Sequence, residues 1–230
     1  MTNKFAVIGL GLFGKSIAKS LANKGAEILA IDHDIHEVES IKDDVAYAVA
    51  LDATDIKAIK AQNITDFDAV VVAIGENFEG LLMTTVLLIE LGVKRVIARA
   101  ANERQRIILE KLGVKEILSP EGTIGESVAE MLLNPDLKSY LKLPDTYQII
   151  EVTLPTSLIG ARVREIKLRE NYNINLITVK RKFVEVKDGE EVEVEHVIGV
   201  PKPDSELLKG DQLLLMGKEI DFEKFFDVNK

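Results

Sequence analysis

The stretch from Lys4 to Asp32 constrains the fold more than any other part of the sequence. An apolar run, Phe5–Ile8, leads into Gly9-Leu10-Gly11-Leu12-Phe13-Gly14, and an amphipathic segment with helical spacing follows. A second apolar run then ends in Asp32. Strand, glycine-rich turn, helix, strand and acid, in this order, are the fingerprint of a dinucleotide-binding unit. The pattern therefore favours a nucleotide site over a purely structural turn.

The three glycines have separate physical roles in such a turn. Gly9 permits the tight turn, Gly11 lets backbone N–H groups approach a phosphate, and Gly14 lets the helix pack on the strand. The helix N-terminus then offers unpaired N–H donors and a partial positive charge to the phosphates. Asp32 would accept hydrogen bonds from ribose hydroxyls, and its charge disfavours the 2′-phosphate of NADP. The pattern does not say which nucleotide is bound, or whether any chemistry is done on it.

Composition narrows the class of protein. The chain has 230 residues, enough for one large or two small domains, and 47% of them are hydrophobic. It has no cysteine, which excludes disulfides and thiolate metal sites, and its net charge of −9 argues against nonspecific nucleic-acid binding. No apolar run approaches the roughly 18 residues that span a bilayer, and the N-terminus lacks a signal-peptide pattern. We expect a cytoplasmic protein that binds no nucleic acid, with attachment to a membrane protein left open.

Strands and helices continue to alternate after Asp32. We expect further strands at residues 46–51, 69–74, 95–98 and 116–118, and helices at residues 35–41, 56–61, 78–91 and 103–112. Strands flanked by helices imply a parallel sheet covered on both faces. Six strands match an α/β fold with a Rossmann-like, doubly wound sheet, whose ligand lies at the switch point beside the first strand.

The pattern changes near Asn134-Pro135. Residues 137–143 are expected to continue as a linking helix, which Pro144 ends. A small α+β domain follows, with strands at 147–154, 174–180 and 212–216, a helix within 158–171, and a last helix near 222–226. Apolar and charged residues alternate on both sides of Asp188-Gly189, which predicts a half-exposed hairpin.

Several motifs together resemble one protein family. Besides the glycine-rich turn they are Asp52-Ala53-Thr54-Asp55, Arg99-Ala100-Ala101-Asn102, Ser119-Pro120-Glu121, Ile198-Gly199-Val200-Pro201 and Gly210-Asp211-Gln212-Leu213-Leu214-Leu215-Met216-Gly217. Over essentially its full length the chain resembles the regulatory subunits of bacterial potassium uptake channels, of the TrkA/KtrA type. The resemblance implies an RCK (regulator of potassium conductance) N-terminal nucleotide-binding domain at 1–134, a linker helix at 135–146 and an RCK C-terminal domain at 147–230.

The resemblance also implies a set of cofactor-binding residues at the ends of successive strands. They are Gly9, Gly11, Leu12, Phe13, Gly14, Asp32, His33, Asp52, Ala53, Thr54, Ala73, Ile74, Gly75 and Arg99. Residues 52–54 would border the adenine, unless Asp52 or Thr54 only caps the next helix. Residues 73–75 would allow close backbone approach, unless they are small only for packing. Arg99 would contact a phosphate or ribose, unless it forms a surface ion pair, for example with Glu103.

Leu12 departs from the family pattern. Many nucleotide-sensing relatives carry an arginine here, which reaches the terminal phosphate of the partner's ligand. Lys15 could supply charge instead, and the departure leaves NAD(H) or AMP-like ligands open beside ATP and ADP. His33 could flank the adenosine, although His33 and His36 also fit simple surface turn residues. With His196, the scattered histidines form no metal pattern.

Two further sites follow from the resemblance alone. Glu121 matches a carboxylate that helps to bind a divalent cation, Mg²⁺ or Ca²⁺, at a dimer contact near the phosphates. The alternative is a helix N-terminal acid that the helix dipole favours. Arg169, Ile174 and Asn175 match positions that bind cyclic di-AMP in some KtrA-type proteins. A helix-end charge and a strand-edge polar residue are the alternatives there.

The implied function is gating without catalysis. An adenine nucleotide, ATP, ADP or NAD(H), would favour one of two shapes of a ring of subunits. Homodimers would assemble into an octameric ring, held at the inner face of the cell membrane by a potassium channel subunit of the TrkH/KtrB type. The alternatives are an NAD-dependent oxidoreductase, for which the second domain offers no catalytic constellation, and a free-standing nucleotide sensor.

Overall fold

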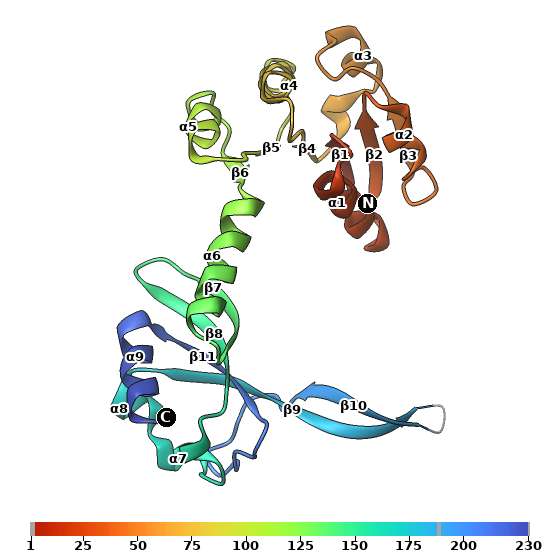
Figure 1. Ribbon diagram of the computed structural model, residues 1–230. Coiled ribbons are helices and arrows are strands. Elements are labelled where there is room, and N and C mark those ends of the chain that lie inside the picture. Colours follow the sequence, from red (N-terminus) through yellow and green to blue (C-terminus); the bar gives the residue numbers. More distant parts are fainter. Residues whose placement is uncertain (1–2, 188–189, 230) are drawn as a thin grey trace. The chain divides into compact units, whose positions relative to one another are not determined.

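The chain folds into two compact units, divided between Thr123 and Ile124 (Figure 1). The computed structural model describes residues 3–187 and 190–229. The predicted hairpin tip at Asp188-Gly189 lies outside the described residues. Within the described part of the chain, no helix is long and apolar enough to cross a membrane.

The first unit is built on a six-stranded parallel sheet. Its strands are β1 (Lys4–Ile8), β2 (Glu27–Asp32), β3 (Tyr47–Ala50), β4 (Ala69–Val72), β5 (Val96–Arg99) and β6 (Glu116–Leu118). They lie in the order β3-β2-β1-β4-β5-β6, and every neighbouring pair is parallel. Strands β2 and β3 are added on one side of β1, and β4, β5 and β6 are added on its other side. This order confirms the predicted Rossmann-like topology and places the switch point between β1 and β4.

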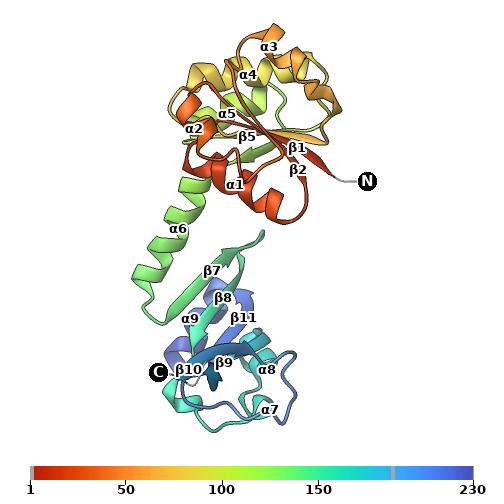
Figure 2. The same ribbon diagram turned by 90° about the vertical axis from the view of Figure 1, so that its right-hand side faces the viewer.

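Helices cover both faces of this sheet (Figure 2). They are α1 (Leu12–Asn23), α2 (Ile35–Glu39), α3 (Ile56–Ala61), η1 (Ile64–Asp66), α4 (Phe78–Glu90) and α5 (Glu103–Lys111), and α6 (Pro120–Leu133) follows β6. Successive residues of β1 belong to two hydrophobic cores, one on each face of the sheet. Ala6 and Ile8 pack with α3, α4 and α5, whereas Val7 packs with α1 and α2. The near-continuous apolar strands follow from this, because neither face of the sheet meets water.

The turn between β1 and α1 requires glycine at two positions. Gly9 has a φ of +92°, and a Cβ atom there would lie 2.8 Å from the backbone nitrogen of Ile74. A Cβ atom on Gly14 would lie 1.8 Å from the carbonyl oxygen of Gly9. Helix α1 can therefore rest on the end of β1 only because Gly14 has no side chain.

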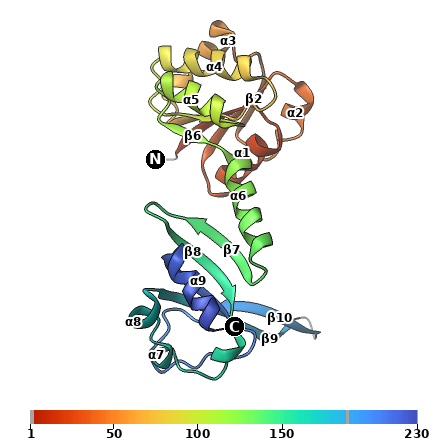
Figure 3. The ribbon, with the colours of Figure 1, turned by 60° about the vertical axis from the view of Figure 1, so that its left-hand side comes forward.

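The second unit contains a five-stranded antiparallel sheet. Its strands are β7 (Leu137–Lys142), β8 (Tyr147–Thr153), β9 (Asn175–Lys187), β10 (Glu190–Val197) and β11 (Gln212–Lys218), in the order β10-β9-β11-β8-β7. Its helices are η2 (Thr156–Leu158), α7 (Val163–Ile166), α8 (Leu168–Tyr172) and α9 (Glu219–Val228). Helix α9 packs on the sheet through Phe222 and Phe225 (Figure 3), which confirms the predicted α+β class.

The predicted linking helix at residues 137–143 is wrong. These residues include strand β7, which pairs antiparallel with β8, and the helix that precedes them is α6. The pairing register shifts between Leu137 and Ser139. This irregularity brings Leu137 and Tyr140, three residues apart, to the same core. Their spacing therefore imitates that of a helix face.

A buried ion pair joins two strands of the second unit. Asp211 is fully buried just before β11, and both its oxygens accept hydrogen bonds of 2.7 Å from the Arg181 guanidinium. Oδ2 of Asp211 also accepts from the backbone N–H of Leu208. The carboxylate raises the pKa of Arg181 above its usual range. The Gly210-Asp211 motif is thus a structural feature of this unit, with its charge fully hydrogen-bonded.

Gly14→Ala tests the contact between α1 and β1. The added methyl group collides with the Gly9 carbonyl, so we expect the free energy of unfolding to fall by about 3 kcal/mol in denaturant titrations. Gly122→Ala in α6 is the matched control, because no atom lies within 4 Å of its added Cβ. There, stability should stay unchanged or rise by about 0.5–1 kcal/mol. Equal stability of the two variants would contradict the packing of α1 described above.

Candidate nucleotide-binding site

The residues expected to bind a cofactor lie along one edge of the parallel sheet. They follow the carboxyl ends of five strands: residues 9–14 after β1, 32–33 at the end of β2, 52–54 after β3, 73–75 after β4, and Arg99 at the end of β5. Because parallel strands present their carboxyl ends together, the fold gathers these residues at the edge where such sheets bind ligands. Their contact with a nucleotide stays a prediction.

Helix α1 begins without a capping side chain. Gly11 is its N-cap residue, and no side chain accepts from the first N–H groups of the helix. The four helices from α2 to α5 all have such a cap, supplied by Asp34, Asp55, Asn77 and Asn102. No atom lies within 4 Å of a Cβ placed on Gly11, so the space before α1 is open. The start of α1 thus has the donors and the room that a phosphate group requires.

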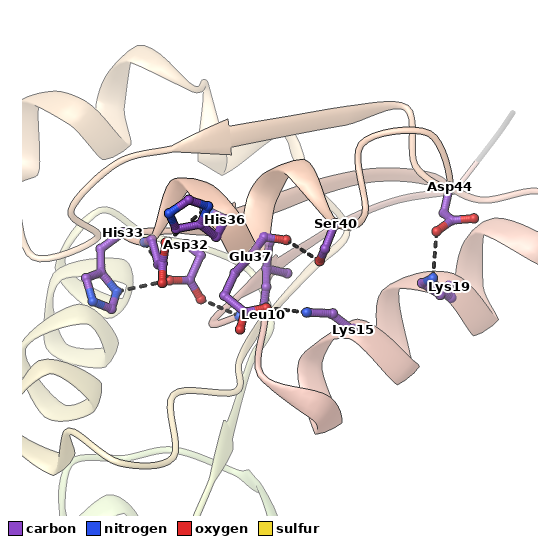
Figure 4. Close-up of polar contacts among 10 residues, drawn as sticks. Leu10, Lys15, Lys19, Asp32, His33, His36, Glu37, Ser40 and Asp44 are labelled. Atoms are coloured by element: carbon purple, nitrogen blue, oxygen red, sulfur yellow. Dashed lines mark hydrogen bonds and ion pairs between the residues drawn. The ribbon is translucent and has the colours of Figure 1, made fainter.

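The Asp32 carboxylate holds this turn in place (Figure 4). Its Oδ2 accepts a 2.6 Å hydrogen bond from the backbone N–H of Leu10, and its Oδ1 accepts from Asp34 N–H at 2.9 Å. His33 Nδ1 lies 2.9 Å from the same Oδ1, while the His33 side chain is 87% exposed. Each carboxylate oxygen can accept a second hydrogen bond. Asp32 can therefore hold the turn and still receive a ribose hydroxyl.

The charge of Lys15 is balanced by a carboxylate of α2. Its ammonium group forms an ion pair with Glu37 of α2, and Figure 4 draws the two groups facing each other. Leu12, by contrast, is 93% exposed and contributes no charge to the turn. In this structure neither Leu12 nor Lys15 places an unpaired cation at the start of α1.

Residues 52–55 form two successive turns. Oδ1 of Asp52 accepts from the backbone N–H of Thr54 at 2.9 Å and from its hydroxyl at 2.7 Å. The Thr54 hydroxyl, then its N–H, then the charge of His33 hold the pKa of Asp52 below its usual range. The cap of α3 is Asp55, so the alternative that Asp52 or Thr54 caps this helix is wrong. Ala53 packs into the core, which leaves the two polar side chains exposed.

Arg99 connects several of the expected residues. Its guanidinium lies 5.5 Å from the centroid of the Phe13 ring and against Gly75, where an added Cβ would meet Nη1 at 2.5 Å. It forms an ion pair with Glu121 at the start of α6, instead of the expected alternative partner Glu103. Arg99 Nε is buried without a hydrogen-bond partner. A side chain at residue 75 would therefore require the Arg99 guanidinium to move.

Glu121 has a cation beside it already. The Arg99 guanidinium neutralises its charge within one chain. The described residues contain no group of three or more His, Asp or Glu that could hold a metal ion. The role of Glu121 as a ligand of Mg²⁺ or Ca²⁺ stays a prediction.

The residues matched to cyclic di-AMP binding lie in the second unit. Arg169 is exposed on α8, Asn175 is half-buried at the start of β9, and Ile174 is fully buried beside Phe222 and Gly217. The Ile174 side chain therefore belongs to the core here. Binding of cyclic di-AMP at these residues stays a prediction.

Sequence reasoning missed two parts of the site. Leu10 donates the hydrogen bond that fixes Asp32, through a backbone group that no sequence pattern reports. Glu37 forms an ion pair with Lys15. For Glu37 a signal was available: Asp34 three residues before an acidic residue is a common start of a helix, and Asp34 does cap α2.

The match to a known family agrees with this geometry. Residues 5–120 match the model of the TrkA-N domain, a range that includes all the expected cofactor-binding residues but not Glu121. The chain belongs to this family. Ktr system potassium uptake protein C of Bacillus subtilis is 32% identical over 225 residues, which are 98% of this chain and 96% of the relative. Ktr system potassium uptake protein A of the same organism is 31% identical over 222 residues, 96% of this chain and 95% of the relative. The likeness to Ktr proteins thus covers both units.

Solved structures support the same fold. The GsuK channel has a TM-score of 0.69 at 12% identity, covering 100% of this chain and 40% of the channel chain. The GsuK RCK domain has a TM-score of 0.53 at 22% identity, covering 99% of this chain and 46% of that one. A structure of the GsuK channel bound to NAD has a TM-score of 0.52 at 21% identity. The match covers 99% of this chain and 38% of the channel chain.

Gly11→Ala separates binding from folding. Because the space around Gly11 is open and its φ is −62°, the variant should unfold within about 1 kcal/mol of the parent. Its methyl group would occupy the space predicted for a phosphate, so we expect affinity for AMP and NAD to fall at least about tenfold in titration calorimetry. Gly125→Ala in α6, also in open space, should leave nucleotide affinity unchanged and stability unchanged or raised by about 0.5–1 kcal/mol. Unchanged nucleotide affinity in Gly11→Ala would place the phosphate elsewhere.

Proposed function

We propose that this chain is a nucleotide-binding regulatory subunit of a bacterial potassium uptake system. The observation that carries the proposal is likeness to two Ktr system potassium uptake proteins over at least 96% of the chain. The uncapped start of α1 opposite a buried aspartate supports a nucleotide as the regulatory ligand. The protein acts through binding, without turnover of the ligand.

The described residues fit an adenine nucleotide at the edge beside β1. The free N–H groups at the start of α1 would hold the phosphates, and Asp32 would accept from the ribose. Arg99 lies close enough to Phe13 to serve the same phosphates. A fold relative, the GsuK channel, has a structure bound to NAD, which makes NAD(H) a candidate beside ATP and ADP.

A divalent cation would complete the charge balance if Arg99 and Glu121 both faced bound phosphates. Glu121 and the phosphates repel one another unless a cation lies between them. Mg²⁺ or Ca²⁺ is the cation proposed for this place. One chain supplies a single carboxylate there, so a dimer contact is the arrangement that would bring further ligands.

The partner in this proposal is a membrane potassium channel subunit of the TrkH/KtrB type. Homodimers of the chain would form a ring at the inner face of the membrane. A nucleotide can change the state of such an assembly only by as much as its affinities for two shapes differ. This relation allows regulation of potassium flux without a catalytic residue.

Asp32→Asn tests the nucleotide site. Loss of the charge should weaken the hydrogen bonds to the ribose, so affinity for NAD should fall about tenfold. The preference for NAD over NADP should shrink, because a 2′-phosphate no longer meets a carboxylate. Titration calorimetry with both nucleotides measures the two effects.

The matched control for this test is Asp66→Asn, which lies before β4 at the opposite edge of the sheet. It removes the same charge and should leave both affinities unchanged. The unfolding temperature without ligand reports any damage from the bonds that Asp32 makes to Leu10 and Asp34. A stable Asp32→Asn variant with unchanged affinity for every adenosine ligand would contradict the assignment of the nucleotide site.

Association with a channel subunit distinguishes regulation from a free-standing sensor. Co-expression with a tagged Ktr-type membrane subunit should yield a complex in detergent, and NAD, ADP or ATP should alter potassium flux through that complex in vesicles. A chain that binds nucleotide but forms no such complex would support the free-standing sensor. Steady oxidation of NADH with a small substrate would instead favour an oxidoreductase.

A further inference from the structure

The second unit contains a cavity of about 610 Å³ that the nucleotide site does not use. The end of α6, strands β7 and β8, and helix α9 contribute to its lining (Figure 3). The carboxylates in that lining include Glu130, Asp136, Glu219 and Glu223. Its apolar part includes Ile150, Phe222 and Phe226. We call this cavity the acidic groove.

The charge of the acidic groove has one sign. No lysine or arginine lines it among the described residues. Glu219 and Glu223 form no ion pair within the described part of the chain. The one aromatic hydroxyl in the lining is that of Tyr140. Burial raises the pKa of Tyr140, and the charges of Glu130 and Glu219 add to the rise against the effect of Lys142. The groove therefore has a negative potential over an apolar floor.

Three lysines of the neighbouring strands and helix have partners outside the groove lining. Lys142 pairs with Glu126 of α6. Lys218 lies 5.2 Å from the centroid of the Tyr147 ring. Lys224 donates to the carbonyl oxygen of Asn171 at 2.8 Å. Glu219 and Glu223 form no ion pair with these lysines, so these two carboxylates can bind a cation that comes from outside this unit.

We propose that the acidic groove docks a basic amphipathic segment of the membrane partner. Lysine or arginine side chains would meet the carboxylates, and a leucine-like side chain between them would enter the apolar floor. This inference rests on the proposed function. Cytoplasmic segments of membrane proteins are rich in lysine and arginine, so the partner's segments have the required charge.

The same charges disfavour other occupants. An anionic lipid surface would be repelled by the carboxylates. A second copy of this chain could occupy the groove only through a basic surface, because another acidic surface would be repelled by the groove's carboxylates. Complementary charge mainly speeds association and selects the partner, whereas the apolar floor supplies the contact area that a stable complex needs. A basic segment that also carries an apolar side chain satisfies both conditions.

A synthetic helical peptide of lysine and leucine tests the proposal on the full-length chain. Fluorescence anisotropy should detect its binding, and a peptide with glutamate in place of lysine should not bind. Affinity should fall as salt rises, because the charges on the two surfaces are screened. Absence of binding by the lysine peptide at low salt would overturn the proposal.

Paired substitutions locate the binding surface. Glu219→Lys with Glu223→Lys reverses the charge of the groove and should weaken peptide binding at least about tenfold. Glu170→Lys with Glu191→Lys changes the net charge equally on exposed residues outside the groove, and it should retain affinity within about twofold. Equal loss in both variants would mean that only net charge matters, and the groove would not be the site.

Two further measurements separate the remaining outcomes. NAD affinity of the groove variant should equal that of the parent, so failure of the nucleotide site and failure of the groove are distinguishable. Light scattering of the two variants tests a second copy as the occupant. Dissociation of an oligomer in the groove variant alone would identify the groove as a contact between copies and would overturn the proposal.

Discussion

The hydrogen bond from the Leu10 N–H to the Asp32 carboxylate is the contact on which the candidate site depends. It joins the end of β2 to the turn after β1, and it is 2.6 Å long and buried. The other oxygen of Asp32 accepts from Asp34, the residue that caps α2. One carboxylate thus fixes the entry to two helices. Hydrogen bonds to a charged group contribute about 1.5–3 kcal/mol each, and without such donors the burial of this charge would destabilise the fold.

With the turn held by Asp32, the first unit can leave one helix start without a cap. A missing cap costs about 1 kcal/mol when the N–H groups stay unpaired. Four helices avoid this cost with a side chain, whereas α1 begins at Gly11 with open space before it. The first N–H groups of α1 are therefore free for a phosphate group, as the proposed function requires.

The sequence predicted those parts of the fold that depend on local patterns. The glycine-rich turn, the six strands and the helices between them follow from residue spacing, because both faces of the sheet are covered. The helix expected at 137–143 failed, because a register shift in β7 moves Leu137 and Tyr140 to the same core. The partner of Arg99 could not be predicted either. Glu103 follows the end of β5 and Glu121 follows the end of β6, so the sequence allows either as the partner. The position of α6 in the fold places Glu121 beside Arg99.

The pair of Arg99 and Glu121 also bears on how a bound ligand could act at a distance. Glu121 lies in the first turn of α6, and α6 continues past Thr123 into the second unit. Arg99 is 20% exposed and Glu121 is 49% exposed, so their ion pair contributes at most about 1 kcal/mol. A guanidinium can bind a phosphate through charge-assisted hydrogen bonds of the same kind. Arg99 could therefore leave Glu121 for a bound phosphate at little cost in free energy. This change would release the start of α6, the helix that runs from the first unit into the second.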